Sequence, residues 1–254
     1  MEFKISSYCI QKRGNLPEEC EDSCYPQDNG ICADNYYKVA IADGATESFF
    51  SSIWAKIITR NFSNKKNQDL NSYLTDCHND WIKWKRDYFL ERKEKNIPIQ
   101  WFEEYGIKKG AYSSMLGLII SKKENLNTYT ISALGDSCFF HFRDGYLLES
   151  FPIKKSDEFS NSPHLISSEN PFDVVTIKKF QKIKRKYRNG DLLILGTDAI
   201  AAWILKEIEE CNSPTSRLDL IENNEAFISF IDELRDENNI RNDDVTLTLI
   251  YVME

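Results

Sequence analysis

Residues 128–150 read TYTISALGDSCFFHFRDGYLLES, and this stretch decides the fold class. Short runs rich in β-branched and aromatic residues lie at 128–134, 138–143 and 146–150. Gly135-Asp136 separates the first two runs, and Asp144-Gly145 separates the last two. Asp-Gly between two such runs is typical of a tight hairpin turn. The stretch therefore predicts consecutive antiparallel strands.

The pattern on either side of this stretch extends the prediction to the whole chain. Further strands are predicted at 3–10, 36–42, 112–121, 174–177, 192–196 and 245–252. Apolar residues at helical spacing predict helices at 49–58, 70–95, 200–210 and 225–237. Helices that lie between groups of strands, without regular alternation, favour an α+β arrangement of two stacked sheets. No glycine-rich phosphate loop follows a strand, which argues against a nucleotide-binding fold.

Composition indicates an ordinary globular chain of one domain, residues 1–254. Hydrophobic residues make up 41% and charged residues 28% of the 254 residues. The formal net charge of −8 argues against nucleic acid as a partner, because that binding depends on clustered Lys and Arg. Lys and Arg do gather between 178 and 188, where a solvated face or a charged edge strand is the simpler interpretation.

The cysteines and the apolar runs predict a soluble, cytoplasmic protein without a membrane partner. The seven cysteines are odd in number and form no Cys-x-x-Cys pair, which disfavours a zinc site and favours reduced thiols. No signal-peptide core opens the sequence, and no apolar run is long enough to cross a bilayer.

Aspartates stand at the ends of the predicted strands. They are Asp43 after 36–42, Asp136 between 128–134 and 138–143, Asp198 after 192–196, and Asp243 before 245–252. Carboxylates held at one edge of a sheet repel one another, and a hard divalent cation offsets that repulsion. Oxygen ligands with few histidines favour Mg²⁺ or Mn²⁺ over zinc or copper.

Each aspartate taken alone has a simpler interpretation. Asp43 and Asp198 could cap helices, because each follows a strand and precedes a helix. Asp136 could merely make a turn, and Asp243 could belong to a solvated turn before the last strand. Spacing alone leaves these alternatives open.

The order of the whole set resembles one known family. Five blocks occur in sequence: Glu21-Asp22, VAIA before Asp43-Gly44, ALG before Asp136-Ser137, LLILGT before Asp198, and Asp243-Asp244-Val-Thr246. From about residue 6 to 252 this order resembles the metal-dependent (PPM, type 2C) protein serine/threonine phosphatases, in a divergent bacterial-type branch. The resemblance implies a four-layer α-β-β-α sandwich, in which two mainly antiparallel sheets are flanked by helices.

The resemblance also implies a site and an activity. Asp22, Asp43, Asp198 and Asp243 would ligate two Mg²⁺ or Mn²⁺ ions, together with the carbonyl of Gly44. Glu21 would act through metal-bound water, and Asp136 would help Asp198 to hold a third, looser ion. Residues 152–180 would form the family's variable flap. The activity implied is hydrolysis of phosphoserine or phosphothreonine in a phosphoprotein substrate, in signalling with a partner kinase.

Three departures from the family pattern leave alternatives open. Ala45-Thr46-Glu47 follow Asp43-Gly44 where Gly-rich sequence is commoner, and Ala199 follows Asp198 in place of glycine. Pro17 stands where the family has its phosphate-binding arginine, which makes Arg13 the nearest candidate for that role. These departures motivate two alternatives on the same fold: a regulatory or binding module with little turnover, and a hydrolase of small phosphoesters.

Overall fold

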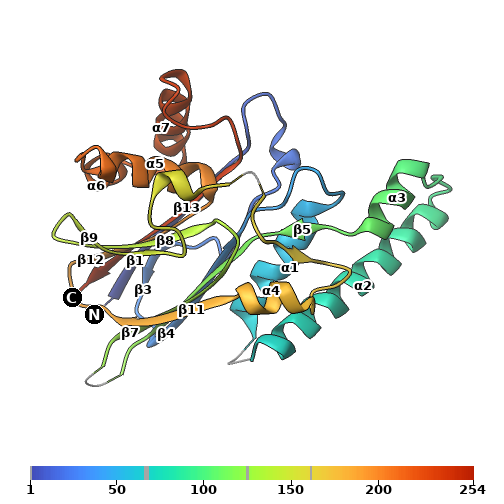
Figure 1. The fold of residues 1–254 in the computed structure, drawn as a ribbon, viewed down its shortest axis with the longest axis horizontal. Helices are drawn as coiled ribbons and strands as arrows, with labels where there is room; N and C mark the ends of the chain where they lie inside the picture. The colour runs from blue at the N-terminus through green and yellow to red at the C-terminus, as the bar shows by residue number, and fades with distance from the viewer. Residues whose placement is uncertain (1, 66–68, 124–125, 161) are drawn as a thin grey trace.

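Two antiparallel sheets stacked face to face form the centre of the molecule (Figure 1). The computed structural model describes residues 2–65, 69–123, 126–160 and 162–254. The first sheet consists, in spatial order, of β3 (Asn29–Cys32), β1 (Glu2–Ile10), β13 (Val245–Met253), β12 (Asp191–Gly196), β8 (Cys138–Arg143) and β9 (Tyr146–Phe151). The second consists of β11 (Gln181–Lys186), β7 (Thr128–Leu134), β6 (Met115–Ser121), β4 (Tyr36–Ala42) and β2 (Ser23–Tyr25).

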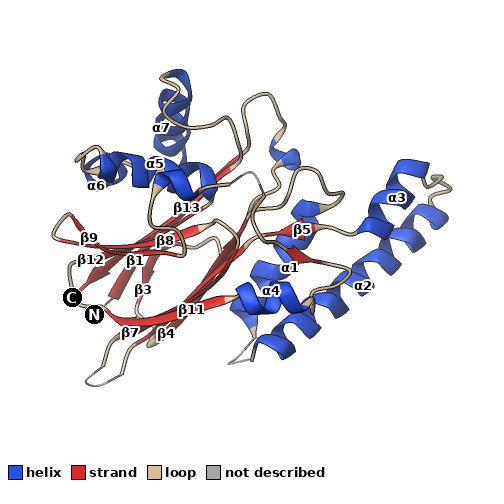
Figure 2. Ribbon diagram, viewed as in Figure 1, coloured by secondary structure: helices blue, strands red, loops and turns tan. Residues whose placement is uncertain are grey.

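Helices cover the outer face of each sheet, as Figure 2 shows. The first sheet carries α5 (Asp198–Glu209), α6 (Pro214–Leu218) and α7 (Asn224–Asp236). The second carries α1 (Ser51–Asn64) and α2 (Leu70–Glu94), and α3 (Trp101–Lys109) packs on the far end of α2. The predicted four-layer α-β-β-α sandwich is confirmed.

Alternation along the strands divides the apolar residues among three cores. In β12, Leu192 and Ile194 pack under α5 and α7, whereas Leu193 and Leu195 face the second sheet. A strand buried on both faces reads as a continuous apolar run, which is why LLIL lacks the usual alternation. The third core lies between the second sheet and the helices α1 and α2, around Trp54.

Small residues let α1 approach the second sheet closely. Ala40 and Ala42 of β4 are fully buried on the face that α1 covers. Gly117 of β6 lies under the ring of Phe62, and a Cβ at this position would come within 2.4 Å of the ring. Close packing of a helix on a sheet thus depends on missing side-chain volume at these positions.

The predicted elements match the structure well in the strands and less well in three segments. The segment 174–177, predicted as a strand, is wrong: it belongs to the helix α4 (Val174–Lys179). Its β-branched residues suggested a strand, but Asp173 caps a helical turn by accepting a hydrogen bond from Thr176 N at 3.0 Å. The helix predicted from 49 begins at Ser51, because Phe50 adopts a left-handed φ of 62°.

Several described elements fall outside the predicted helices and strands, among them α6 and β10 (Ile166–Ser167). The polar loop 11–35 contains β2 and β3, and α3 was not predicted. The strand predicted at 112–121 is divided at Ser114 into β5 (Tyr112–Ser113) and β6. Glu103 stabilises the start of α3 by accepting a hydrogen bond from Gln100 N at 2.7 Å.

The predicted flap, residues 152–180, crosses the mouth of the sandwich, although residue 161 lies outside the described residues. It contains α4, a short 3₁₀ turn and β10 (Ile166–Ser167), which pairs with β5. Among the described residues, none of the helices is both long and apolar enough to cross a bilayer.

Candidate metal centre

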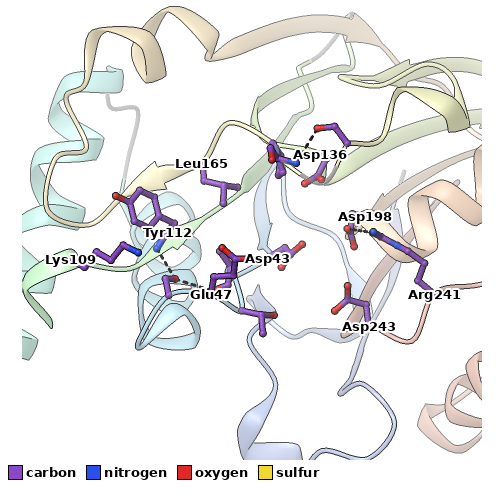
Figure 3. Close-up of a pocket in the computed structure, with 16 residues that line it drawn as sticks. Asp43, Glu47, Lys109, Tyr112, Asp136, Leu165, Asp198, Arg241 and Asp243 are labelled. Carbon is purple, nitrogen blue, oxygen red and sulfur yellow. Dashed lines mark hydrogen bonds and ion pairs between the residues drawn. The ribbon is translucent and has the colours of Figure 1, made fainter. Parts of the chain in front are cut away.

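A cavity of about 490 Å³ opens where the two sheets meet the flap, and acidic residues line one side of it. Asp43 lies just after β4, Asp136 in the β7–β8 turn, Asp198 at the start of α5, and Asp243 just before β13. In Figure 3 these four carboxylates surround a common space. The structure therefore brings together the aspartates that the sequence placed at strand ends.

Backbone contacts fix the loop that carries Asp43. Asp43 N donates to Ser114 Oγ at 2.9 Å, and Asp43 O accepts from Ser114 N and Ser113 Oγ, both at 2.8 Å. The interruption between β5 and β6 thus serves to hold this loop. Gly135, with a φ of 102°, places Asp136 nearby, and a Cβ there would come within 2.6 Å of the Ser114 Cβ.

None of the cavity aspartates is a helix cap. Asp198 is the first residue of α5, and the N-cap position belongs to Thr197. The helix α1 begins eight positions after Asp43, at Ser51. Neither capping interpretation from the sequence therefore accounts for these carboxylates.

Burial and nearby negative charge raise the pKa values of Asp43, Asp136 and Asp198. Burial, then the charges of Asp198 and Asp136, hold the pKa of Asp43 well above its ordinary value. Burial and the charge of Asp198 raise the pKa of Asp136 to about 7. Burial also raises the pKa of Asp198, although Arg241 opposes the shift. Clustered carboxyls with raised pKa values are typical of functional sites.

Asp22 lies behind this cluster and is 4% exposed. Its Oδ2 accepts a hydrogen bond from Thr197 Oγ1 at 2.9 Å. Burial, followed by the charge of Asp43, holds the pKa of Asp22 well above its ordinary value. Asp22 Oδ1 and Asp136 Oδ1 are buried without a hydrogen-bond partner among the described residues. Buried oxygens of this kind usually have an additional partner.

The donor chemistry of the cluster fits a hard divalent cation. The four cavity aspartates, with Asp22 behind them, supply oxygen atoms only, as Mg²⁺ and Mn²⁺ prefer. A divalent charge would offset the repulsion that raises these pKa values. As they stand, no three His, Cys, Asp or Glu side chains in the described ranges are grouped closely enough to hold one ion.

Gly44 lines the cavity and is buried where three segments meet. A Cβ at this position would lie 2.8 Å from Glu21 O and 2.9 Å from both the carbonyl carbon and the Cβ of Ser51. Glycine is therefore required beside Asp43, because backbone and side-chain atoms of Glu21 and Ser51 leave no room for a Cβ.

Gly44→Ala is expected to lower stability by about 1–3 kcal/mol, because backbone atoms on both sides must move. The same movement displaces Asp43, so Mn²⁺ binding should weaken as well. Thermal unfolding and calorimetric titration with Mn²⁺ would measure the two effects. An alanine variant with wild-type stability would contradict the packing interpretation.

Three predicted residues do not line the cavity: Asp22, which lies behind it, Glu21 and Arg13. The Glu21 carboxylate accepts from Ser51 Oγ and lies 3.9 Å from Lys12 Nζ. Arg13 points to α7, where its guanidinium pairs with Asp236 at 2.7 Å and Asp232 at 3.1 Å.

Arg241 is the arginine that lines the cavity, and the sequence interpretation missed it. Its Nη2 donates to Asp198 Oδ2, and Lys109 lies on the other side of the cavity beside Tyr112 (Figure 3). The available signal was a basic residue two positions before Asp243.

The chain is similar to known proteins in its fold and not in its sequence. No family model matches the chain, and no curated protein sequence is significantly similar to it. Among solved structures, the Mycobacterium tuberculosis serine/threonine phosphatase PstP superposes with a TM-score of 0.61 and 13% identity, with all of both chains covered. The chain has the fold of the PPM-type serine/threonine phosphatases. The predicted resemblance is thereby confirmed at the level of fold.

Two further PPM-type structures were solved with metal ions. The catalytic domain of PstP in complex with two manganese ions has a TM-score of 0.57 and 14% identity, over 100% of this chain and 99% of that one. RsbX in complex with magnesium has a TM-score of 0.53 and 19% identity, over 98% and 94%. At these identities the likeness concerns the PPM-type fold, and the site residues must be argued from the chain itself.

Proposed function

We propose that the chain is a metal-dependent phosphatase that hydrolyses phosphoserine or phosphothreonine in proteins. The observation that carries the proposal is the convergence of Asp43, Asp136, Asp198 and Asp243 on one cavity. The raised pKa values of Asp43, Asp136 and Asp198 favour a divalent cation there, and Mg²⁺ or Mn²⁺ fits the oxygen donors. Related folds that contain manganese or magnesium support the choice of metal.

The proposed ligands follow from the placement of the residues. Asp22, Asp43, Asp198, Asp243 and the Gly44 carbonyl would hold two ions, and Asp136 with Asp198 would hold a third. Such ions, when bound, supply an activated water and offset charge on the phosphoryl oxygens. Glu21 would act on that water only from behind the Asp43 loop, where Ser51 Oγ fixes its carboxylate.

The chain's own residues would position the substrate. Ser160, Pro163 and Leu165 of the flap also line the cavity and would contact residues beside the phosphorylated side chain. Lys109, at the far side of the cavity, would bind acidic groups of the substrate. The proposal includes a partner kinase that supplies the phosphoprotein, and a cytoplasmic location that the scattered cysteines support.

Removing the metal is expected to abolish turnover. With Mn²⁺ or Mg²⁺ the protein should hydrolyse para-nitrophenyl phosphate and a phosphothreonine peptide, and excess chelator should lower both rates by at least about 100-fold. Phosphate release measured at matched ionic strength checks this. Turnover that persists in chelator would contradict a metal-dependent mechanism. Hydrolysis of the aryl phosphate but of no phosphopeptide would favour a small phosphoester as substrate.

One observation favours a second candidate, a regulatory module that binds partners without turnover. The guanidinium of Arg241 already neutralises Asp198, so part of the acidic cluster has an internal counter-charge. Calorimetric binding of Mn²⁺ together with no hydrolysis of any phosphoester would favour this module over the enzyme.

A further inference from the structure

Arg241 lies among the carboxylates of the cavity. It precedes β13 by four residues, and its half-exposed side chain pairs with Asp198. The charges of Asp243 and Asp136 also act on the guanidinium. Arg241 therefore places a positive charge within the acidic cluster at which the metals are proposed.

The loop that carries Arg241 is firmly anchored. Arg235 of α7 is 8% exposed, and its Nη2 donates to Asp243 O at 2.7 Å and to Gln11 O at 3.0 Å. Asp243 N donates to Arg241 O at 3.0 Å. These contacts fix the backbone on both sides of Asn242, so Arg241 and Asp243 are held in one orientation toward the cavity.

The contact with Asp198 uses only part of the guanidinium. Nη2 donates to Asp198 Oδ2, and guanidinium carries five N–H donors in a planar fork. The remaining donors suit a tetrahedral oxyanion, which a guanidinium can bind through two parallel hydrogen bonds. Moreover, a divalent cation that takes Asp198 Oδ2 competes with Nη2 and so releases more donors toward the cavity.

We propose that Arg241 binds the phosphoryl group of the substrate, and that metal binding at Asp198 frees its guanidinium for this task. The proposal deepens the proposed phosphatase function and rests on it. A phosphomonoester dianion would otherwise meet an acidic wall, because four aspartates line the cavity. Arg241 supplies positive charge on that same wall, whereas Lys109 lies across the cavity (Figure 3).

The test compares Arg241→Gln with two other arginine variants. Arg185→Gln is the matched control, because Arg185 has the same side-chain exposure of 52% and also pairs with one carboxylate, Glu149, far from the cavity. Arg13→Gln tests the rival arginine. The readouts are the Kd of Mn²⁺ by calorimetry, the Kd of inorganic phosphate with Mn²⁺ present, and the KM for para-nitrophenyl phosphate.

Arg241→Gln is expected to raise the phosphate Kd and the KM by about tenfold or more, because charge-assisted hydrogen bonds are lost. It should also lower the Mn²⁺ Kd about threefold to tenfold, because Asp198 loses its competing partner. Arg241→Lys, which keeps the charge without the fork, should show an intermediate phosphate Kd. Arg185→Gln and Arg13→Gln should leave all three values unchanged.

Several results would overturn the inference. An unchanged phosphate Kd in Arg241→Gln, or a larger loss in Arg13→Gln, would remove the phosphate-binding role. Weaker Mn²⁺ binding in Arg241→Gln would refute competition at Asp198. If circular dichroism shows that Arg241→Gln does not fold, Arg241→Lys replaces it in the test. A wild-type phosphate Kd in Arg241→Lys would then refute binding of phosphate by paired guanidinium hydrogen bonds. Absence of wild-type turnover would refute the phosphatase alone, because the two Kd values need no hydrolysis.

Discussion

Asp43→Asn is expected to lower kcat/KM for para-nitrophenyl phosphate with Mn²⁺ by more than about 100-fold while making the metal-free protein more stable. The loss follows from the position of Asp43 at the centre of the acidic cluster, where one charged ligand disappears. Supporting groups of metal sites already cost 10–100-fold when removed, so loss of a ligand should cost at least as much. Steady-state kinetics over a range of Mn²⁺ concentrations measures it.

The gain in stability follows from the raised pKa of Asp43. Burial and the charges of Asp198, Asp136 and Asp243 disfavour the ionised form in the folded state. Ionised Asp43 therefore destabilises the folded protein. This cost is absent below the pKa of Asp43 in the unfolded chain, near 3.9, and grows as the pH rises toward and through its pKa in the folded protein. In chelator, Asp43→Asn should raise the melting temperature by roughly 2–4 °C at pH 8, and less at pH 5. A lower melting temperature at pH 8 would contradict mutual repulsion.

Asp198→Asn is the matched comparison. It should lose activity to a similar extent, because Asp198 lines the same cavity. It should gain no stability in chelator, since removal of the Asp198 charge leaves Arg241 without its carboxylate. Retained activity in either asparagine variant would refute the assignment of the metal centre.

Much of the fold was predictable because local chemistry specifies it. Asp144-Gly145 adopts φ values of 52° and 81°, which a tight hairpin turn requires, and the β8–β9 hairpin follows from it. The run 192–196 forms β12 as predicted, since four consecutive aliphatic residues in a short segment suit a strand buried on both faces. The structure of such segments can be predicted from their own residues.

The missed elements depend on contacts distant in sequence. β2 has three residues and exists through its pairing with β4. The helix α3 is short, and its packing on α2 and on Phe49 supplies what its sequence pattern lacks. The segment 174–177 is a different case, because a local contact decides it: the cap by Asp173, three residues before Thr176, outweighs the β-branched preference for a strand.

The residues of the candidate site likewise include some that the sequence predicts and some that depend on contacts distant in sequence. Asp43, Asp136, Asp198 and Asp243 were predictable because strand ends at one edge of a sandwich converge. Arg241 was not, because the loop that carries it is held by Arg235, which binds the carbonyls of Asp243 and of Gln11, the latter 224 positions away in the chain. The rotation of Arg13 toward α7 likewise depends on acids more than 200 residues later in the chain.

Asp191→Asn is expected to destabilise the protein by about 3–5 kcal/mol without loss of activity at 25 °C. Asp191 begins β12 and is 1% exposed. Its carboxylate accepts hydrogen bonds from Arg143 at 2.7 and 2.9 Å and from Arg188 N at 2.8 Å, and His141 Nε2 lies 2.8 Å away. At roughly 2–4 °C per kcal/mol, the melting temperature should fall by about 6–20 °C.

The pH dependence separates this carboxylate from those of the cavity. Burial raises the pKa of Asp191, but the hydrogen bonds from Arg143, Arg188 N and His141 outweigh it and hold the pKa below its ordinary value. Its stabilisation is therefore complete above the unfolded pKa near 3.9 and is lost as the pH falls through the folded value. The deficit of Asp191→Asn should accordingly persist from pH 8 to 5 and shrink below about 4.

Asp144→Asn serves as the control for Asp191→Asn. Asp144 pairs with Arg188 at 3.1 Å, its side chain is 75% exposed, and asparagine tolerates its left-handed φ of 52°. Its melting temperature should change by less than about 2 °C. An equal loss in both variants would show that charge at this end of the sheet, and not buried pairing, stabilises β12. Opposite shifts for Asp191→Asn, in the first sheet, and Asp43→Asn, after β4 of the second, would instead distinguish a carboxylate that stabilises the fold from one that destabilises it.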